Sequence, residues 1–179
     1  MDSNLAGKTK EAREKSRVLG GLLVDLGARI ASCESCTSGA LADAISWEPG
    51  ASAWFEVGLV CYSERAKTLL AGVDPFIFAT DGVVSLKVAE AMARGVSERS
   101  DSRFGVATTG LAGPGGGEGP KGSQPQGMVC IATWDCATAA SSSQVFIFDG
   151  DREAVRAAAT LAAMDMAEDM VRQAPALRS

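Results

Sequence analysis

Short apolar segments typical of β-strands alternate along this chain with segments that have helical spacing. The strand-like segments are residues 28–33, 55–62, 104–109, 127–134 and 144–148. Apolar residues recur at helical spacing in residues 9–26, 35–45, 63–70, 85–100 and 152–172. Alternation of this kind places helices on both faces of a sheet. We therefore expect an α/β fold with three α/β/α layers and a mixed, mostly parallel sheet of about five strands.

The chain length of 179 residues fits one domain with its own core. We expect residues 1–179 to form a single domain, on which an N-terminal helix within residues 1–27 packs. The last two strands are close in sequence and are expected to pair as a hairpin. The glycine-rich segment 110–127 is expected to be a loop too flexible for regular structure.

The absence of histidine excludes several catalytic classes. Ser-His-Asp and Cys-His catalysis, histidine-bound zinc and imidazole proton transfer all need that side chain. Acid–base chemistry must then come from Lys, Tyr, Asp, Glu or Cys. The net charge of −5 argues against nucleic acid as a partner, because such proteins present a basic face. No apolar run is long enough to cross a membrane, and the polar N-terminus does not resemble a secretory signal.

Two common nucleotide-binding motifs are excluded in this sequence, and a cysteine motif is only weakly indicated. Gly117, Gly119 and Gly122 match the spacing of a dinucleotide-binding loop, but Pro120 and the residues after it cannot begin the required helix. No Walker A sequence follows either. The pair Cys33-x-x-Cys36 allows a redox site or half a zinc site, although the five cysteines are otherwise far apart. We favour a packing role for Cys33 and expect no metal.

Three segments that each follow a strand carry side chains suited to catalysis. The turn after the first strand holds Ser35, which is either a nucleophile or simply a helix cap. Lys67 lies about one helical turn beyond Tyr62, the only tyrosine. A lysine kept from water can act as a neutral base, although most lysines are solvated. Thr109 opens a glycine-rich loop that can either hold an anion or be an ordinary surface loop.

Together, these segments resemble the CinA C-terminal domain family, whose members include nicotinamide-nucleotide amidohydrolases. The resemblance covers about residues 28–172 and rests on ESCTSG (34–39), WFEVGLVCYSERAKTLLAGV (54–73), DGVVS (81–85), ATTGLAGPGGG (107–117), GMVCIA (127–132) and FDGDREAVR (148–156). It implies a hydrolase that converts nicotinamide mononucleotide to nicotinic acid mononucleotide and ammonia. It also implies that no cofactor is needed.

The resemblance assigns roles to individual residues. Ser35 is then the nucleophile and Lys67 the base that activates it, while Tyr62 positions groups or relays the proton. Thr109 and the backbone amides near Ser35 would stabilise the oxyanion. The remaining substrate-binding residues are expected to be Cys36, Thr37, Gly110, Gly113, Gly115 and Arg152, with Arg152 or Arg156 for the phosphate.

The chain departs from the family pattern at a few positions. Ser38 replaces a second glycine, and Glu64-Arg65 replaces a more usual Asn-Glu pair. These departures motivate two alternatives: a module that binds a nucleotide without turnover, and an amidase for a different amide. Many family members carry a further N-terminal domain, and this chain is expected to be the stand-alone form. We further expect a pyridine nucleotide as the small-molecule partner, a homodimer and a cytoplasmic location.

Overall fold

A five-stranded sheet forms the centre of the protein, of which the computed structural model describes residues 3–176. Residues 1–2 and 177–179 of the expected domain lie outside the described residues. The strands, in their order across the sheet, are β2 (Phe55–Val60), β1 (Ile30–Glu34), β3 (Phe104–Gly110), β6 (Met128–Asp135) and β7 (Ala140–Ile147). The pairs β2–β1 and β1–β3 are parallel, whereas β6 is antiparallel to both neighbours. All strands but β6 therefore run in one direction, as expected for a mixed, mostly parallel sheet.

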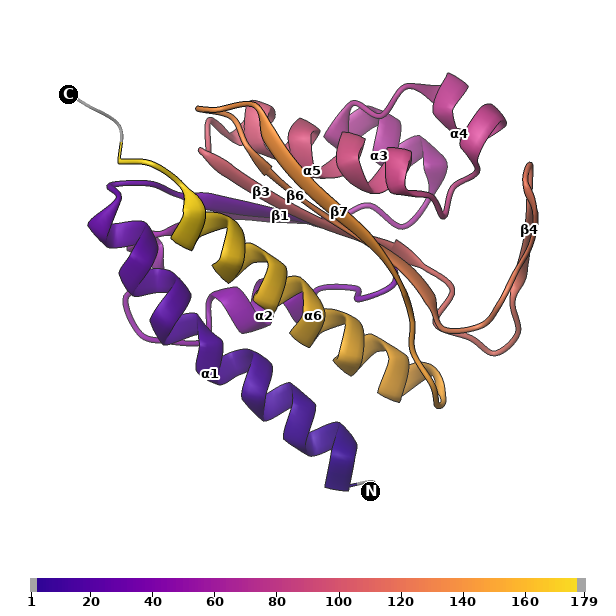
Figure 1. The fold of residues 1–179 in the computed structure, drawn as a ribbon, viewed down its shortest axis with the longest axis horizontal. Helices are drawn as coiled ribbons and strands as arrows, with labels where there is room; N and C mark the ends of the chain where they lie inside the picture. The colour runs from indigo at the N-terminus through magenta and orange to yellow at the C-terminus, as the bar shows by residue number, and fades with distance from the viewer. Residues whose placement is uncertain (1–2, 177–179) are drawn as a thin grey trace.

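Helices cover both faces of this sheet (Figure 1). On one face lie α1 (Ser3–Asp25), α2 (Ala40–Ile45) and α6 (Arg152–Gln173); on the other lie α3 (Glu64–Ala71), α4 (Pro75–Asp81) and α5 (Leu86–Ser100). Alternate strand residues supply the two cores: Ile131 belongs to the cluster beneath α6, whereas Cys130 and Ala132 belong to the cluster beneath α5. The three-layer α/β/α prediction is confirmed. None of the helices within residues 3–176 is both long and apolar enough to cross a membrane.

Two helices differ from the sequence prediction. Helix α4 was not expected, although Asp74 caps its first turn by accepting a hydrogen bond from Phe76 N and Pro75 occupies the first position, a typical helix start. Helix α1 begins at Ser3 rather than at residue 9. Its buried stripe continues toward the N-terminus through the small or polar residues Ser16, Ala12 and Thr9, which a search for large apolar side chains overlooks.

The glycine-rich segment is more regular than predicted. A small hairpin forms between β4 (Gly117–Gly119) and β5 (Gly122–Gln124), so the expectation of a wholly irregular loop is wrong. It stands out from the body of the protein beside α4 (Figure 1). Lys121 forms an ion pair with Asp81, and the Gln124 side chain donates to Val84 O at 2.8 Å. These contacts hold the hairpin in place, although its sequence alone favours disorder.

The predicted hairpin at the C-terminal side of the sheet is confirmed, but its second strand is longer than expected. Strand β7 begins at Ala140 rather than at residue 144. The three serines before Gln144 are polar and gave no strand signal. They nevertheless pair with residues 132–134 of β6, because an edge strand needs no apolar side chains on its exposed face.

The order of the strands brings together the chain segments that follow β1, β2 and β3, at the C-terminal ends of these parallel strands. From β1 the chain passes through α2 to β2 on one side, and then through α3, α4 and α5 to β3 on the other side. The C-terminal end of β1 is therefore a point where the connections diverge to opposite faces. Ligands of open α/β sheets bind at such points.

Close packing of α5 on α3 allows only glycine at position 95. A Cβ atom there would lie 1.7 Å from Ala71 O. We predict that Gly95→Ala lowers the free energy of unfolding by about 1–3 kcal/mol or more, measured by urea denaturation. Gly21→Ala in α1 is the matched control, because no atom lies within 4 Å of its Cβ. There we expect a gain of about 0.5–1 kcal/mol from helix propensity; similar losses in both variants would contradict the steric explanation.

Candidate active site

Ser35 lies at the point of divergence, directly after the last residue of β1. Its N–H donates to Thr108 O of β3 at 3.0 Å, which extends the sheet pairing into the turn. Its side chain is nearly buried, with 8% exposure. The helical segment predicted for residues 35–45 was expected to begin here, but α2 begins only at Ala40 because Ser38 and Gly39 have left-handed backbone angles, with φ of 50° and 95°. A family preference for glycine at position 38 has its physical basis in that angle.

The buried carboxylate of Glu34 holds this turn together. It accepts hydrogen bonds from the N–H groups of Gly39, Leu41 and Ala42 at 2.8–3.1 Å. It also accepts one from the Thr37 hydroxyl at 2.7 Å. A negative charge at the start of α2 is favourable, because the first N–H groups of a helix have no partner within it. We name residues 34–39 the nucleophile turn.

Two distant elements also contact Thr37 in the nucleophile turn. Its hydroxyl lies 2.8 Å from the Thr108 hydroxyl on β3, and its carbonyl accepts from Arg156 of α6 at 2.9 Å. The backbone N–H groups of Cys36 and Thr37, in contrast, donate to no acceptor among the described residues. Two free N–H groups beside a serine hydroxyl are the usual components of an oxyanion hole.

Lys67 reaches Ser35 from the first turn of α3. Its side chain is fully buried, and its Nζ lies 3.1 Å from Ser35 Oγ. The same nitrogen donates to Cys61 O at 2.9 Å and to Tyr62 O at 3.1 Å. No carboxylate within residues 3–176 forms an ion pair with it. The predicted pair of Ser35 and Lys67 is thus in direct contact.

These surroundings shift the Lys67 amine toward its neutral form. Burial lowers the pKa of Lys67, because an ammonium group loses its hydration in the interior. A neutral amine has two N–H bonds and one lone pair. The two N–H bonds match the carbonyls of Cys61 and Tyr62, and the lone pair then faces the Ser35 hydroxyl. The geometry fits a base that removes a proton from serine.

The two cysteines of the C-x-x-C sequence do not form a redox pair. Cys33 belongs to the core beneath α5, whereas Cys36 belongs to the core beneath α6, so the two cysteines of the C-x-x-C sequence lie on opposite faces of the sheet. Burial raises the pKa of the Cys36 thiol to about 12, which keeps it protonated at neutral pH. No cluster of Cys, Asp or Glu suited to a metal ion occurs in the described part of the chain.

Tyr62, Arg152 and Gly113 form a second group at the same edge. The Tyr62 side chain is exposed, and its hydroxyl accepts from Arg152 at 3.2 Å. Arg152, in the first turn of α6, also donates to Gly113 O at 2.9 Å. Of Tyr62, only the backbone carbonyl contacts Lys67, so the side chain faces outward.

The expected residues of the glycine-rich loop are placed differently. The Thr109 hydroxyl is buried and donates to Val83 O at 3.0 Å, whereas the neighbouring Thr108 joins the nucleophile turn. Gly110 is still part of β3 and pairs with Val129. The Gly115 N–H donates to the Gln126 side chain at 2.8 Å. The sequence analysis gave no role to Glu34 or Thr108. The only available signal for Glu34 was its position as an acidic residue before a helix.

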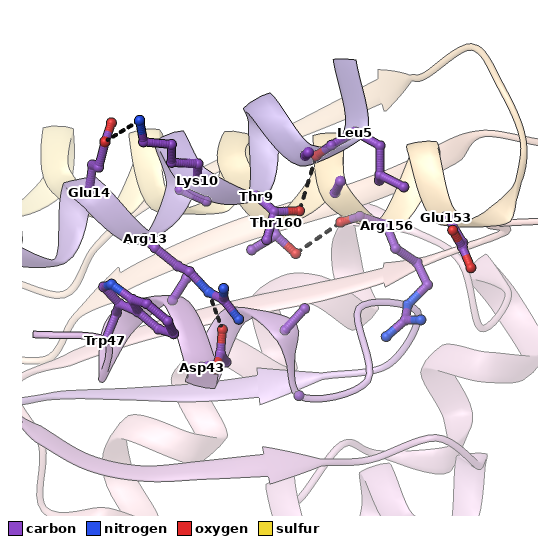
Figure 2. A pocket seen from close by; sticks show the side chains of 16 residues that line it. Leu5, Thr9, Lys10, Arg13, Glu14, Asp43, Trp47, Glu153, Arg156 and Thr160 are labelled. Atoms are coloured by element: carbon purple, nitrogen blue, oxygen red, sulfur yellow. Dashed lines mark hydrogen bonds and ion pairs between the residues drawn. The ribbon is translucent and has the colours of Figure 1, made fainter. Parts of the chain in front are cut away.

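A cavity of about 870 Å³ lies behind the nucleophile turn, among α1, α2 and α6 (Figure 2). Gly39, Ala40 and Arg156 form its wall toward the turn, and Arg13 and Trp47 line the opposite side. Neither Ser35 nor Lys67 borders it. Ser35 and Lys67 therefore lie outside this cavity, at the C-terminal ends of β1 and β2.

The role of the Glu34 carboxylate can be tested by replacing it with an amide. In Glu34→Gln the new NH₂ group must face at least one N–H donor, and we predict a loss of about 1–3 kcal/mol in the free energy of unfolding by urea. Asp151→Asn is the matched control at the start of α6, where the carboxylate accepts from Ala154 N at the surface. Asparagine caps as well as aspartate, so the control should be nearly neutral. Equal losses in both variants would contradict this role.

Comparison with known proteins places the chain in a family. The family model of the CinA C-terminal domain matches residues 12–171. A protein of Pseudomonas putida named nicotinamide-nucleotide amidohydrolase PncC is 46% identical over 147 residues, covering 82% of this chain and 89% of that protein. A CinA-like protein of Acidobacterium capsulatum is 43% identical over 142 residues. That match covers 78% of this chain but only 33% of the longer relative.

Solved structures share the fold. A CinA superfamily protein from Escherichia coli has a TM-score of 0.81 and 30% identity, with 90% of each chain covered. A competence/damage inducible protein from Agrobacterium tumefaciens has a TM-score of 0.83 and 32% identity, covering 91% of this chain and 96% of that one. Because the family model matches most of its length and solved structures of that superfamily share its fold, this chain belongs to the CinA C-terminal domain family.

Proposed function

We propose that this protein is an amidohydrolase that converts nicotinamide mononucleotide to nicotinic acid mononucleotide and ammonia, with Ser35 as nucleophile and Lys67 as base. The observation that carries the proposal is the 3.1 Å contact between Lys67 Nζ and Ser35 Oγ in a buried site without an ion-pair partner among the described residues. The reaction is that named for the relative from Pseudomonas putida.

In the first half of the reaction, Ser35 Oγ attacks the carboxamide carbon while its proton passes to Lys67 Nζ. The tetrahedral intermediate then collapses: the C–N bond breaks, and the Lys67 ammonium returns the proton to the leaving nitrogen, which departs as ammonia. In the second half, a water molecule loses a proton to Lys67 and attacks the ester on Ser35. The acid product leaves, and Ser35 recovers its proton.

The free N–H groups of Cys36 and Thr37 support the oxyanion in both halves. The amide oxygen gains negative charge as the tetrahedral carbon forms, and N–H groups without a backbone acceptor are free to bind it. We assign these two N–H groups to the oxyanion hole. Thr109 has its hydroxyl bonded to Val83 O, so its expected help toward the oxyanion stays a prediction without a direct contact.

We assign Arg152 to the substrate phosphate. Its side chain is exposed at the same edge, and a guanidinium group binds phosphate through several N–H donors. Tyr62 contacts Arg152 through its hydroxyl and Lys67 through its backbone carbonyl. Contacts with both groups suit a residue that positions the nucleotide. Of the three glycines expected to bind substrate, Gly115 has open space beside its Cα, whereas Gly110 packs against Met128 O and Gly113 against the Gln126 side chain. The homodimer and the cytoplasmic location stay predictions.

Removal of either member of the catalytic pair should abolish ammonia release. We predict that Ser35→Ala and Lys67→Met each lower kcat by about 10³-fold or more, because the residues act as one unit. The assay is ammonia release from nicotinamide mononucleotide in the presence of a chelator. Lys87→Met is the control, since Lys87 is an exposed lysine that pairs only with Glu90.

Each outcome of this assay separates the alternatives. Wild-type rates in Ser35→Ala would exclude serine catalysis. A folded wild-type protein that releases no ammonia would favour a binding module, unless a panel of other amides reveals a different substrate.

The pH dependence of kcat/KM should report the Lys67 amine in the free enzyme. Only the neutral amine accepts a proton, so kcat/KM should rise with pH through the pKa of Lys67 and level off above it. Because burial lowers that pKa, the midpoint should fall below the ordinary lysine value of 10.5. Tyr62→Phe should keep the midpoint even if its rate is lower. A midpoint at or above 10.5 would contradict a neutral buried lysine.

A further inference from the structure

Arg156 joins the last helix to the nucleophile turn. Its Nη2 donates to Thr37 O at 2.9 Å across 119 residues of sequence. Arg152, one helical turn earlier on α6, contacts Tyr62 and Gly113 instead. The two arginines therefore contact different parts of the site, although the sequence offered them as equivalent candidates for the phosphate.

The position of the Arg156 guanidinium costs folding free energy. Its Nε is buried and has no acceptor within the described residues. The other cations that line the cavity are paired: Lys10 with Glu14 and Arg13 with Asp43. No ion pair with Arg156 occurs in residues 3–176. Figure 2 shows its guanidinium on the far side of the cavity from Arg13 and Asp43. A buried donor without a partner is rare and destabilising, so its retention needs a reason.

Thr37 is the residue on which this guanidinium acts. The Thr37 hydroxyl is bound by Glu34 and Thr108, and its carbonyl is bound by Arg156. Contacts from two sides fix both the side chain and the peptide group that follows. The N–H of that peptide belongs to Ser38 and donates back to Ser35 O at 3.2 Å. The direction of the Thr37 carbonyl thus sets the shape of the turn that carries Ser35 and its oxyanion donors.

We propose that Arg156 is a positioning residue: it holds the nucleophile turn in its reactive shape and does not bind the substrate. This inference rests on the proposed function for its kinetic consequence. Loss of the guanidinium would misplace Ser35 and the N–H groups of Cys36 and Thr37. Displacements of about 1 Å in such groups lower rates by up to about 10²-fold. Substrate affinity depends on other residues, so KM would change little.

The test compares Arg156→Ala with Arg13→Ala, which removes another arginine from the same cavity. We expect kcat of Arg156→Ala to fall about tenfold or more with KM within about twofold of wild type, and kcat of Arg13→Ala to stay unchanged. Arg152→Ala should instead raise KM. Because Arg156 lines the cavity, its truncation leaves space for a small cation. Ethylguanidinium should therefore restore kcat in Arg156→Ala, and ethylammonium should not, since only the planar group matches the lost donor geometry.

Several results would overturn the proposal. Wild-type kcat in Arg156→Ala, or a loss confined to KM, would show that the turn does not need this contact. Arg156→Met, which keeps the apolar stem, replaces the alanine variant if that variant does not fold. Hydrogen exchange of the amides in residues 34–42 provides a readout that does not depend on turnover. Faster exchange that ethylguanidinium slows supports the proposal, and unchanged exchange overturns it. If wild type is inactive, the proposed function fails while this second readout still decides the role of Arg156.

Discussion

The proposed active site depends on burial of the Lys67 amine. An ammonium group loses much of its hydration energy on burial, so the neutral form is favoured. Three elements create this environment. The end of β2 supplies the carbonyls of Cys61 and Tyr62, the first turn of α3 supplies the lysine, and β1 leads into Ser35.

The fold could be predicted from the sequence wherever the pattern was local. The short, mostly apolar segments of β1 and β3, the helical spacing in α5 and the two-strand ending were all visible without tertiary information. Helix α4 was missed although Asp74 and Pro75 mark its start, because its seven residues are too few for a periodic signal. The hairpin of β4 and β5 was missed for another reason. Glycine favours many conformations, and this one is selected by distant contacts to Asp81 and Val84.

The candidate site also contains some residues that the sequence indicated and others whose roles depend on distant contacts. Ser35 and Lys67 were chosen through the family resemblance, and their contact needs only the adjacent strands β1 and β2. Glu34 and Thr108 gave no comparable signal, and Arg156 was a candidate only for the phosphate, because the contacts of all three with Thr37 join separate parts of the chain. The Tyr62 side chain was expected beside the proton transfer. Its backbone carbonyl lies there instead, and no sequence pattern distinguishes these two roles.

The order in which the parts of the site occur along the chain has a consequence for biosynthesis. Ser35 and Lys67 both lie in the first half of the polypeptide, but β1 is central and needs β3 as its second neighbour. Thr108 follows much later, and Arg156 lies within the final helix. A chain still on the ribosome thus exposes the reactive serine and lysine long before the residues that shape their turn have emerged. Because such non-local contacts form slowly, assembly of the site belongs to the last stage of folding.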